Sequence, residues 1–130
     1  MWTARFDPKE REIWVRVRIH GTLGTWDVEC LLDTGTSITI ISSAVLDSLG
    51  YGAHMGKTQR DVIGPGGVSV PGYTIDVALE LMGLRLRTHE VLAQDILPDT
   101  YGVEGLIGMD VVEGRLLTID GRVGTVRLEE

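Results

Sequence analysis

One acidic residue, Asp33, stands where a carboxylate could carry out proton chemistry, because an apolar strand ends there and the chain must turn on a glycine. The segment Leu31–Ser37 reads Leu-Leu-Asp-Thr-Gly-Thr-Ser. Residues 26–32 become fully apolar just before Asp33, and residues 38–41 are apolar and β-branched again, a pattern typical of two buried strands. A carboxylate between buried strands is costly unless it is hydrogen-bonded or functional. Asp33 is therefore a candidate catalytic residue.

A second interpretation of the same segment is an ordinary solvated turn between two strands. Asp, Thr, Gly and Ser are common turn residues, and the Asp-Thr-Gly triplet is a weak pattern by itself. The apolar flanks and two features further along the chain favour the catalytic interpretation. These features are a glycine-rich hairpin near residues 58–72 and an apolar Leu-Ile-Gly segment at residues 106–108.

The elements that must position this aspartate are strands. Repeated short apolar runs, 17 glycines and few aromatic residues indicate an all-β domain with tight turns. Residues 13–19 alternate between apolar and polar at period two, as a half-buried strand does. Three hairpins are expected, over residues 57–63 with 68–70, 73–81 with 84–93, and 116–120 with 123–128. One further short strand is expected at residues 105–108.

Capping patterns predict the helical segments. Ser42 and Ser43 offer an N-cap for a short helix at residues 44–49. Gly50 suits the position just after the C-terminus of this helix. Residues 110 and 113, an Asp and a Glu, have the spacing of a capping box and predict a brief helical turn.

Length and composition limit the domain organisation. At 130 residues, the chain has room for one domain with a modest core. We expect a charged N-terminal segment at residues 1–12 and a single domain over residues 13–130. Met1–Arg18 lacks the apolar stretch of a signal peptide, and no run approaches the roughly 18 apolar residues of a spanning helix. With Cys30 as the single cysteine, these features predict a soluble, cytoplasmic protein with no membrane partner.

Charge and histidine spacing bear on other kinds of partner. A net charge of −7 with scattered basic residues argues against nucleic-acid binding. His20, His54 and His89 lie far apart in the sequence, and none has the spacing of a metal ligand with Cys30. We therefore expect no metal site and no cofactor.

The order of these parts resembles the retropepsin-like aspartic proteases, the single-domain relatives of pepsin found in retroviruses and bacteria. The Asp-Thr-Gly segment, the glycine-rich hairpin and the Leu-Ile-Gly segment follow one another in the family's order and near its spacings, and the resemblance covers about residues 13–128. It implies a closed β-barrel of the acid-protease fold with one or two short helices. It also implies an aspartic endopeptidase that hydrolyses peptide bonds with two aspartates.

The resemblance assigns roles within this sequence. Asp33 is the catalytic residue. Its loop is supported by Thr34, Gly35, Thr36, Leu106, Ile107 and Gly108. Because the sequence holds a single Asp-Thr-Gly, the second carboxylate must come from a second copy, which implies a homodimer with two-fold symmetry. Thr34 is expected to hydrogen-bond across the dimer axis, and the Thr36 hydroxyl to donate to Asp33 and shift activity toward lower pH.

The hairpin of the resemblance is a candidate flap that closes over an extended polypeptide substrate. Its residues are Ile63, Gly64, Pro65, Gly66 and Gly67. An ordinary exposed hairpin is the alternative. Residues 1–12 are charged and contain Pro8, so we expect only residues 123–128 to be ready for a dimer sheet.

Two alternatives to an active homodimer stay open on the sequence. One is a proteolytically weak or inactive retropepsin-like module for dimerisation or peptide binding. The other is a monomeric, zymogen-like domain that needs a partner or a cleavage to assemble. The intact Asp-Thr-Gly favours the enzyme, since a binding module has less need for a carboxylate at that turn.

Overall fold

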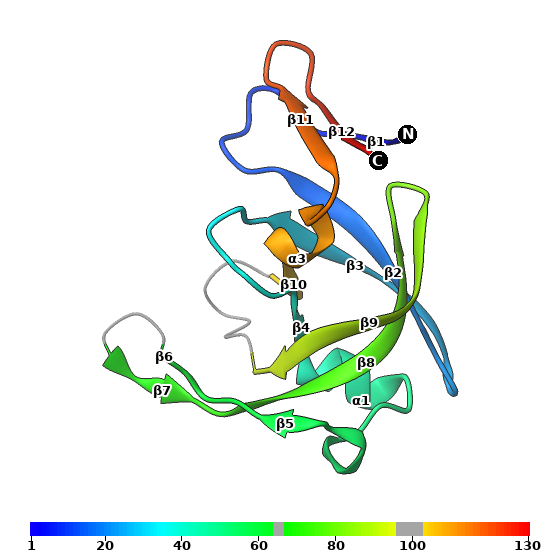
Figure 1. Ribbon diagram of the computed structural model, residues 1–130, viewed down its shortest axis with the longest axis vertical. Helices are drawn as coiled ribbons and strands as arrows, with labels where there is room; N and C mark the ends of the chain where they lie inside the picture. The colour runs from blue at the N-terminus through cyan, green and yellow to red at the C-terminus, as the bar shows by residue number, and fades with distance from the viewer. Residues whose placement is uncertain (64–66, 96–102) are drawn as a thin grey trace.

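Strands dominate the chain, as its short apolar runs predict. The computed structural model describes residues 1–63, 67–95 and 103–130 (Figure 1). The strands are β1 (Trp2–Arg5), β2 (Trp14–Gly21), β3 (Gly24–Leu32), β4 (Ile40–Ser42), β5 (Thr58–Gln59), β6 (Val62–Ile63), β7 (Ser69–Val70), β8 (Gly72–Leu81), β9 (Leu84–Gln94), β10 (Gly105–Ile107), β11 (Leu116–Asp120) and β12 (Thr125–Glu129). The helical elements are α1 (Ser43–Ser48), the 3₁₀ turn η1 (Ala53–Met55) and α3 (Met109–Val112).

Six of these strands close a barrel. Strands β2, β3, β10, β4, β9 and β8 are hydrogen-bonded in that order, and β2 also pairs with β8, which closes the ring. Strand β10 runs parallel to β3, and β4 runs parallel to β9, while the other pairs in the ring are antiparallel. The predicted all-β, closed-barrel fold with one or two short helices is confirmed, and the described residues contain two, α1 and α3.

The barrel interior is apolar and tightly packed. Alternate residues of β2 point inward, and Val15, Val17 and Ile19 are at most 2% exposed, as the period-two pattern requires. Cys30 is buried among them, and burial raises the pKa of its thiol to about 12, so this cysteine is an inert core residue. Gly105 packs against it, since a Cβ there would lie 2.7 Å from the Cys30 sulfur.

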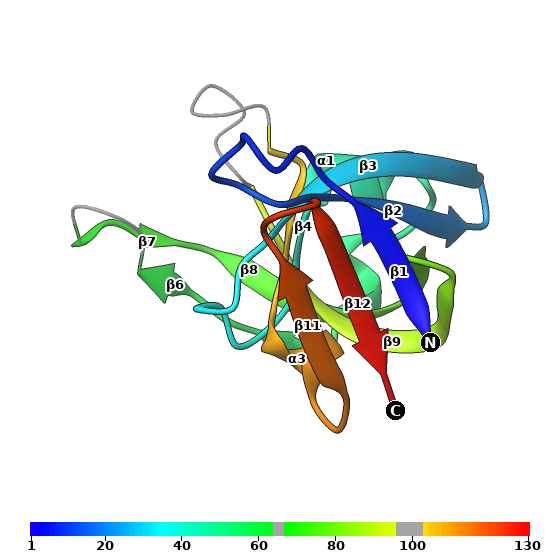
Figure 2. The same ribbon diagram turned by 90° about the horizontal axis from the view of Figure 1, so that it is seen from above.

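A second, three-stranded sheet joins both ends of the chain in the order β1, β12, β11 (Figure 2). Within one chain, Trp2 lies opposite Leu128, and Arg5 lies opposite Thr125. The guanidinium of Arg115 stacks 5.8 Å from the centre of the Trp2 ring. The charged N-terminal segment thus contains a strand that pairs with β12 of the same chain, and the expectation that only residues 123–128 are ready for a dimer sheet stays a prediction.

The N-termini of both helices lack the capping interactions that the sequence predicts. Helix α1 ends before Gly50, whose φ of +96° suits a glycine after a helix C-terminus. However, the Ser42 side chain makes no capping hydrogen bond. Helix α3 has Gly108 as its N-cap and contains Asp110, so the predicted capping box is wrong. The Asp110 carboxylate has partners on other elements, which are described below.

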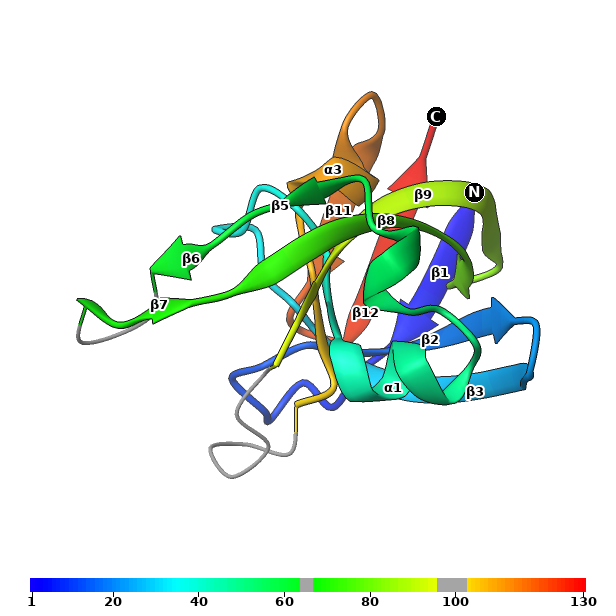
Figure 3. The same ribbon diagram turned by 90° about the horizontal axis from the view of Figure 1, so that it is seen from below.

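The hairpin of the candidate flap extends away from the barrel (Figure 3). Strand β5 pairs with the start of β8, and further out β6 pairs with β7, with Val62 opposite Val70 and Ile63 opposite Ser69. Gly67 has a φ of +76°. The predicted tip residues 64–66 lie outside the described residues. No helix within residues 1–63, 67–95 and 103–130 is long and apolar enough to cross a membrane.

Candidate active site

Asp33 lies directly after β3, at the start of the loop that leads to β4. Its Oδ1 accepts the backbone N–H of Gly35 at 2.9 Å, and its Oδ2 accepts the Thr36 hydroxyl at 2.8 Å. The predicted contact between Thr36 and Asp33 is thus present. Each carboxylate oxygen has a donor from its own loop, so the half-buried side chain is fixed in one orientation.

Strand β10 and the turn after it hold this loop from behind. The backbone N–H of Asp33 donates to the carbonyl of Ile107 at 2.9 Å, and the N–H of Met109 donates to the carbonyl of Thr36 at 2.8 Å. Leu106 and Ile107 lie opposite Leu31 and Leu32 in the parallel pairing of β10 with β3. The Leu-Ile-Gly segment therefore lies directly against the aspartate loop, as the family resemblance implies.

Gly108 allows this contact because its backbone touches the backbone of the loop. A Cβ at this position would lie 2.8 Å from the carbonyl oxygen of Thr36 and 2.8 Å from the carbonyl carbon of Ile38. Both atoms are backbone atoms that cannot move aside without moving the loop. The N–H of Gly108 also donates to the hydroxyl of Thr39 at 3.1 Å. Any larger residue here would push the loop away from β10.

Thr39 contacts Asp110, which in turn contacts His89, and no sequence motif connects these two polar residues with the site. Its hydroxyl donates to Asp110 Oδ1 at 2.8 Å, and Asp110 Oδ2 lies 2.7 Å from Nε2 of His89. Burial alone would raise the pKa of Asp110, but hydrogen bonds from His89 and Thr39 outweigh it and hold that pKa below its ordinary value. Asp110 lies two residues after Gly108 in the sequence, and this proximity to the Leu-Ile-Gly segment is the one sequence feature that indicates a place near the site.

Asp33 and Thr34 line a cavity of about 320 Å³. The other walls come from the segment before β2, the end of β3 and one residue of β11, namely Arg11, Glu12, Ile13, Leu31, Leu32 and Ile119. Thr34 is exposed. The carboxylate therefore opens onto a cavity whose walls are mainly apolar, with a pair of opposite charges from Arg11 and Glu12 at one side.

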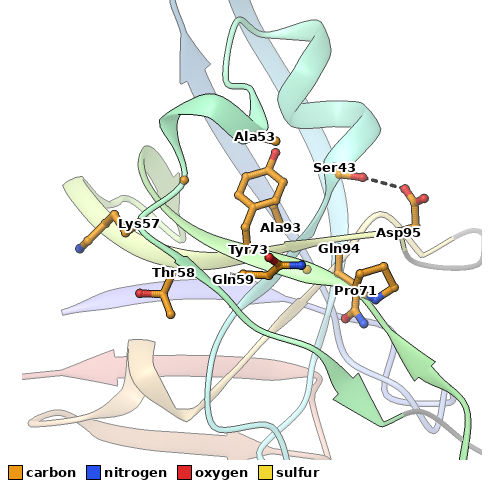
Figure 4. Close-up of a pocket in the computed structure, with 12 residues that line it drawn as sticks. Ser43, Ala53, Lys57, Thr58, Gln59, Pro71, Tyr73, Ala93, Gln94 and Asp95 are labelled. Atoms are coloured by element: carbon orange, nitrogen blue, oxygen red, sulfur yellow. Dashed lines mark hydrogen bonds between the residues drawn. The ribbon is translucent and has the colours of Figure 1, made fainter.

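A larger cavity of about 450 Å³ lies elsewhere, between α1, η1, β5, the start of β8 and the end of β9 (Figure 4). Its walls include Tyr73, Gln94 and a hydrogen bond of 2.7 Å from the Ser43 hydroxyl to Asp95. Asp33 does not line it. In the part of the chain that the structure describes, no group of His, Cys, Asp and Glu is arranged to hold a metal ion. The candidate site is therefore the smaller cavity at Asp33.

Comparison with known proteins agrees with this geometry. A sequence model of the family described as "Aspartyl protease" matches residues 15–111, a range that includes Asp33, the candidate flap and β10. The chain belongs to the aspartyl protease family. No curated protein sequence matches the chain significantly.

Solved structures show that this aspartyl protease has the retropepsin-like fold. A retropepsin-like aspartic protease from Rickettsia conorii matches with a TM-score of 0.67 and 16% identity, over 98% of this chain and 97% of that one. The EIAV protease complexed with the inhibitor HBY-793 matches with a TM-score of 0.60 and 23% identity, over 83% and 91%. The retroviral protease-like domain of Ddi1 from Leishmania major matches with a TM-score of 0.61 and 15% identity, over 86% and 83%.

Proposed function

We propose that this aspartyl protease is an endopeptidase that acts as a homodimer, with Asp33 of each chain forming one catalytic pair. The observation that carries the proposal is the Asp33 carboxylate itself, oriented by two donors of its own loop and open to a cavity. The sequence holds one Asp-Thr-Gly, so each chain supplies one such carboxylate. A second copy related by a two-fold axis supplies the other.

The chemistry follows from placing two carboxylates side by side. In aspartic proteases generally, two such groups about 3 Å apart cannot both be ionised, so they share one proton. The ionised carboxylate takes a proton from a water molecule between them, and the protonated one donates to the oxygen of the scissile carbonyl. The tetrahedral diol then collapses, and a proton passes to the leaving amine. The peptide bond is cut without a covalent enzyme intermediate.

The free edge of the terminal sheet supports the homodimer. In the described residues β11 pairs with β12 on one side only, which leaves a row of backbone groups to pair with another strand. Leu116 and Ile119 of β11 are 59% and 45% exposed. Ile119 also lines the cavity at Asp33, so a second copy that pairs along β11 would lie next to the catalytic loop.

The surroundings of Asp33 support an extended polypeptide as the substrate. The walls formed by Ile13, Leu31, Leu32 and Ile119 suit an apolar side chain next to the scissile bond. The β6–β7 arm, Val62–Ile63 and Ser69–Val70, is the proposed flap that closes over the chain. A peptide under this arm would gain backbone hydrogen bonds in the manner of an added strand.

A cleavage assay tests this function. The pure protein is incubated with an unfolded protein from pH 3 to pH 8, with and without a statine-type inhibitor, next to Asp33→Asn. We expect inhibitable cleavage in the wild type and a loss of at least about 10³-fold in the variant. Binding of the polypeptide without cleavage would instead support a peptide-binding module.

A further inference from the structure

Behind the Asp33 loop, His89, Asp110 and Thr39 form a hydrogen-bonded chain that takes no part in the proposed reaction. His89 Nε2 lies 2.7 Å from one oxygen of Asp110, and the Thr39 hydroxyl donates to the other at 2.8 Å. Since an ionised carboxylate can only accept, His89 donates from Nε2. The side chains of His89 and Asp110 are each 18% exposed, and Thr39 is fully buried, so water competes little for these contacts.

Asp110 fixes the direction of the Thr39 hydroxyl. A threonine hydroxyl has one proton and two acceptor lone pairs, and its proton rotates to the best acceptor. With that proton directed at Asp110, the lone pairs of Oγ1 are free to accept the N–H of Gly108 at 3.1 Å. The carbonyl of Thr39 also accepts the N–H of Leu92 in β9 at 2.9 Å. Thr39 is thereby fixed through both its side chain and its backbone.

Gly108 stands between the two backbone hydrogen bonds that hold the catalytic loop. On one side, Ile107 accepts the N–H of Asp33, and on the other, Met109 donates to Thr36. A displacement of Gly108 therefore moves Ile107 and Met109, which make these two hydrogen bonds to the loop. Because a misplacement of about 1 Å can cost about 10²-fold in rate, the orientation of one threonine hydroxyl bears on the position of Asp33.

We propose that His89 and Asp110 are a positioning pair for Asp33. They orient the Thr39 hydroxyl so that it accepts from Gly108, and this contact keeps the turn after β10 against the catalytic loop. The role rests on the proposed function of Asp33. A purely structural pair would tie β9 to α3 and contribute to the free energy of unfolding alone.

Kinetics of His89 variants separate these two roles. His89→Leu removes the donor to Asp110, whereas His89→Gln keeps an amide N–H that can reach the carboxylate. We expect His89→Leu to lower kcat about tenfold with KM within about twofold, at a temperature where the variant is folded, and His89→Gln to restore most of kcat. His89→Asn, whose amide is too short to reach Asp110, serves as a second variant if His89→Leu does not fold.

His20 supplies the matched control. It also faces an acid, with Nε2 at 3.9 Å from Glu80, but it joins β2 to β8 and is 40% exposed. His20→Leu is expected to keep kcat unchanged. The proposal is overturned if His89→Leu keeps wild-type kcat per folded molecule, or if His20→Leu loses as much.

Amide hydrogen exchange measured by NMR tests the pair without any activity. In the Asp33→Asn background, His89→Leu should speed exchange at the amides of Gly108 and Met109 at least about tenfold and leave Val17 in the core unchanged. Unchanged exchange at Gly108 and Met109 overturns the proposal. A further outcome is that the wild type shows no cleavage activity while His89→Leu still speeds exchange at these two amides. In that case the proposed function fails and the anchoring of the loop stands.

Discussion

The Asp33 loop and the β6–β7 arm are held in opposite ways, although both belong to the proposed site. The loop is fixed by donors to both oxygens of Asp33 and by backbone hydrogen bonds from β10 and the turn that follows it. The arm extends from the barrel as a pair of two-residue strands, with Val62 opposite Val70 and Ile63 opposite Ser69. Val68 on this arm is 64% exposed.

This difference matches the demands of the two tasks. Proton transfer from a water molecule and to a peptide carbonyl by a pair of carboxylates needs a fixed geometry, and each added hydrogen bond reduces the positions that Asp33 can take. Admission of a polypeptide needs a segment that opens at low cost, and a region with few buried contacts has a low free energy of local opening. Substitutions in the loop should therefore lower activity and stability together, and substitutions in the arm should lower activity alone.

Gly108→Ala tests the loop most severely. Its Cβ would meet backbone atoms of Thr36 and Ile38 at 2.8 Å, so the loop must shift. We expect kcat/KM to fall about 100-fold and the free energy of unfolding, measured in urea, to fall by about 1–3 kcal/mol. Gly121→Ala is the control, because its Cβ meets no atom within 4 Å. A fully active Gly108→Ala would show that the contact between turn and loop is dispensable.

Gly67→Val tests the arm. Gly67 has a φ of +76° and open space around its Cβ, so valine introduces backbone strain without a clash. We expect turnover to fall about tenfold, while the free energy of unfolding changes by less than about 1 kcal/mol, since the arm can relax by itself. Gly114→Val has the same φ and the same open surroundings but lies outside the arm. An equal loss of turnover in both variants would contradict the flap assignment.

Thr36→Ala removes the donor to Asp33 Oδ2 and should have a smaller effect. Loss of a hydrogen bond to the charged form disfavours that form, so the acidic limb of the pH–rate profile should move to higher pH. The rate on the plateau should change by less than about threefold. Thr36→Ser keeps the donor and should keep the limb in place. If the acidic limb of the pH–rate profile does not move in Thr36→Ala, a role for this hydroxyl in setting the pH range is rejected.

Asp110→Asn should have the smallest effect, because the amide oxygen can still accept the Thr39 hydroxyl, and it should make stability less dependent on pH. The pKa of Asp110 is held below its ordinary value, so its contribution is fully present above pH 4 or so and is lost as the pH falls through the lower, folded-state pKa. The variant should be about 1 kcal/mol less stable at neutral pH and lose less stability on acidification. Urea denaturation at a series of pH values measures both. Parallel curves for wild type and variant would contradict the assigned shift.

The sequence predicts the parts of this fold that local patterns encode. The alternation over residues 13–19 and the apolar run before Asp33 locate β2 and β3, whereas the position of β10 against the loop was implied only by the resemblance to the retropepsin-like proteases. Strand β1 was missed, because its pairing with β12 depends on residues more than a hundred positions away. The chain from His89 through Asp110 to Thr39 was missed for the same reason, since Thr39 and Asp110 are 71 positions apart and no spacing rule joins them.

The shared pair of Asp33 carboxylates can be tested most directly by mixing wild-type and Asp33→Asn chains at constant total concentration and allowing subunits to exchange. A mixed dimer would hold one carboxylate and one amide. If both carboxylates are required, an equal mixture retains about a quarter of the wild-type activity, because random pairing leaves about a quarter of the dimers with two intact chains. Retention of half the activity would show that each chain acts alone and would contradict the account.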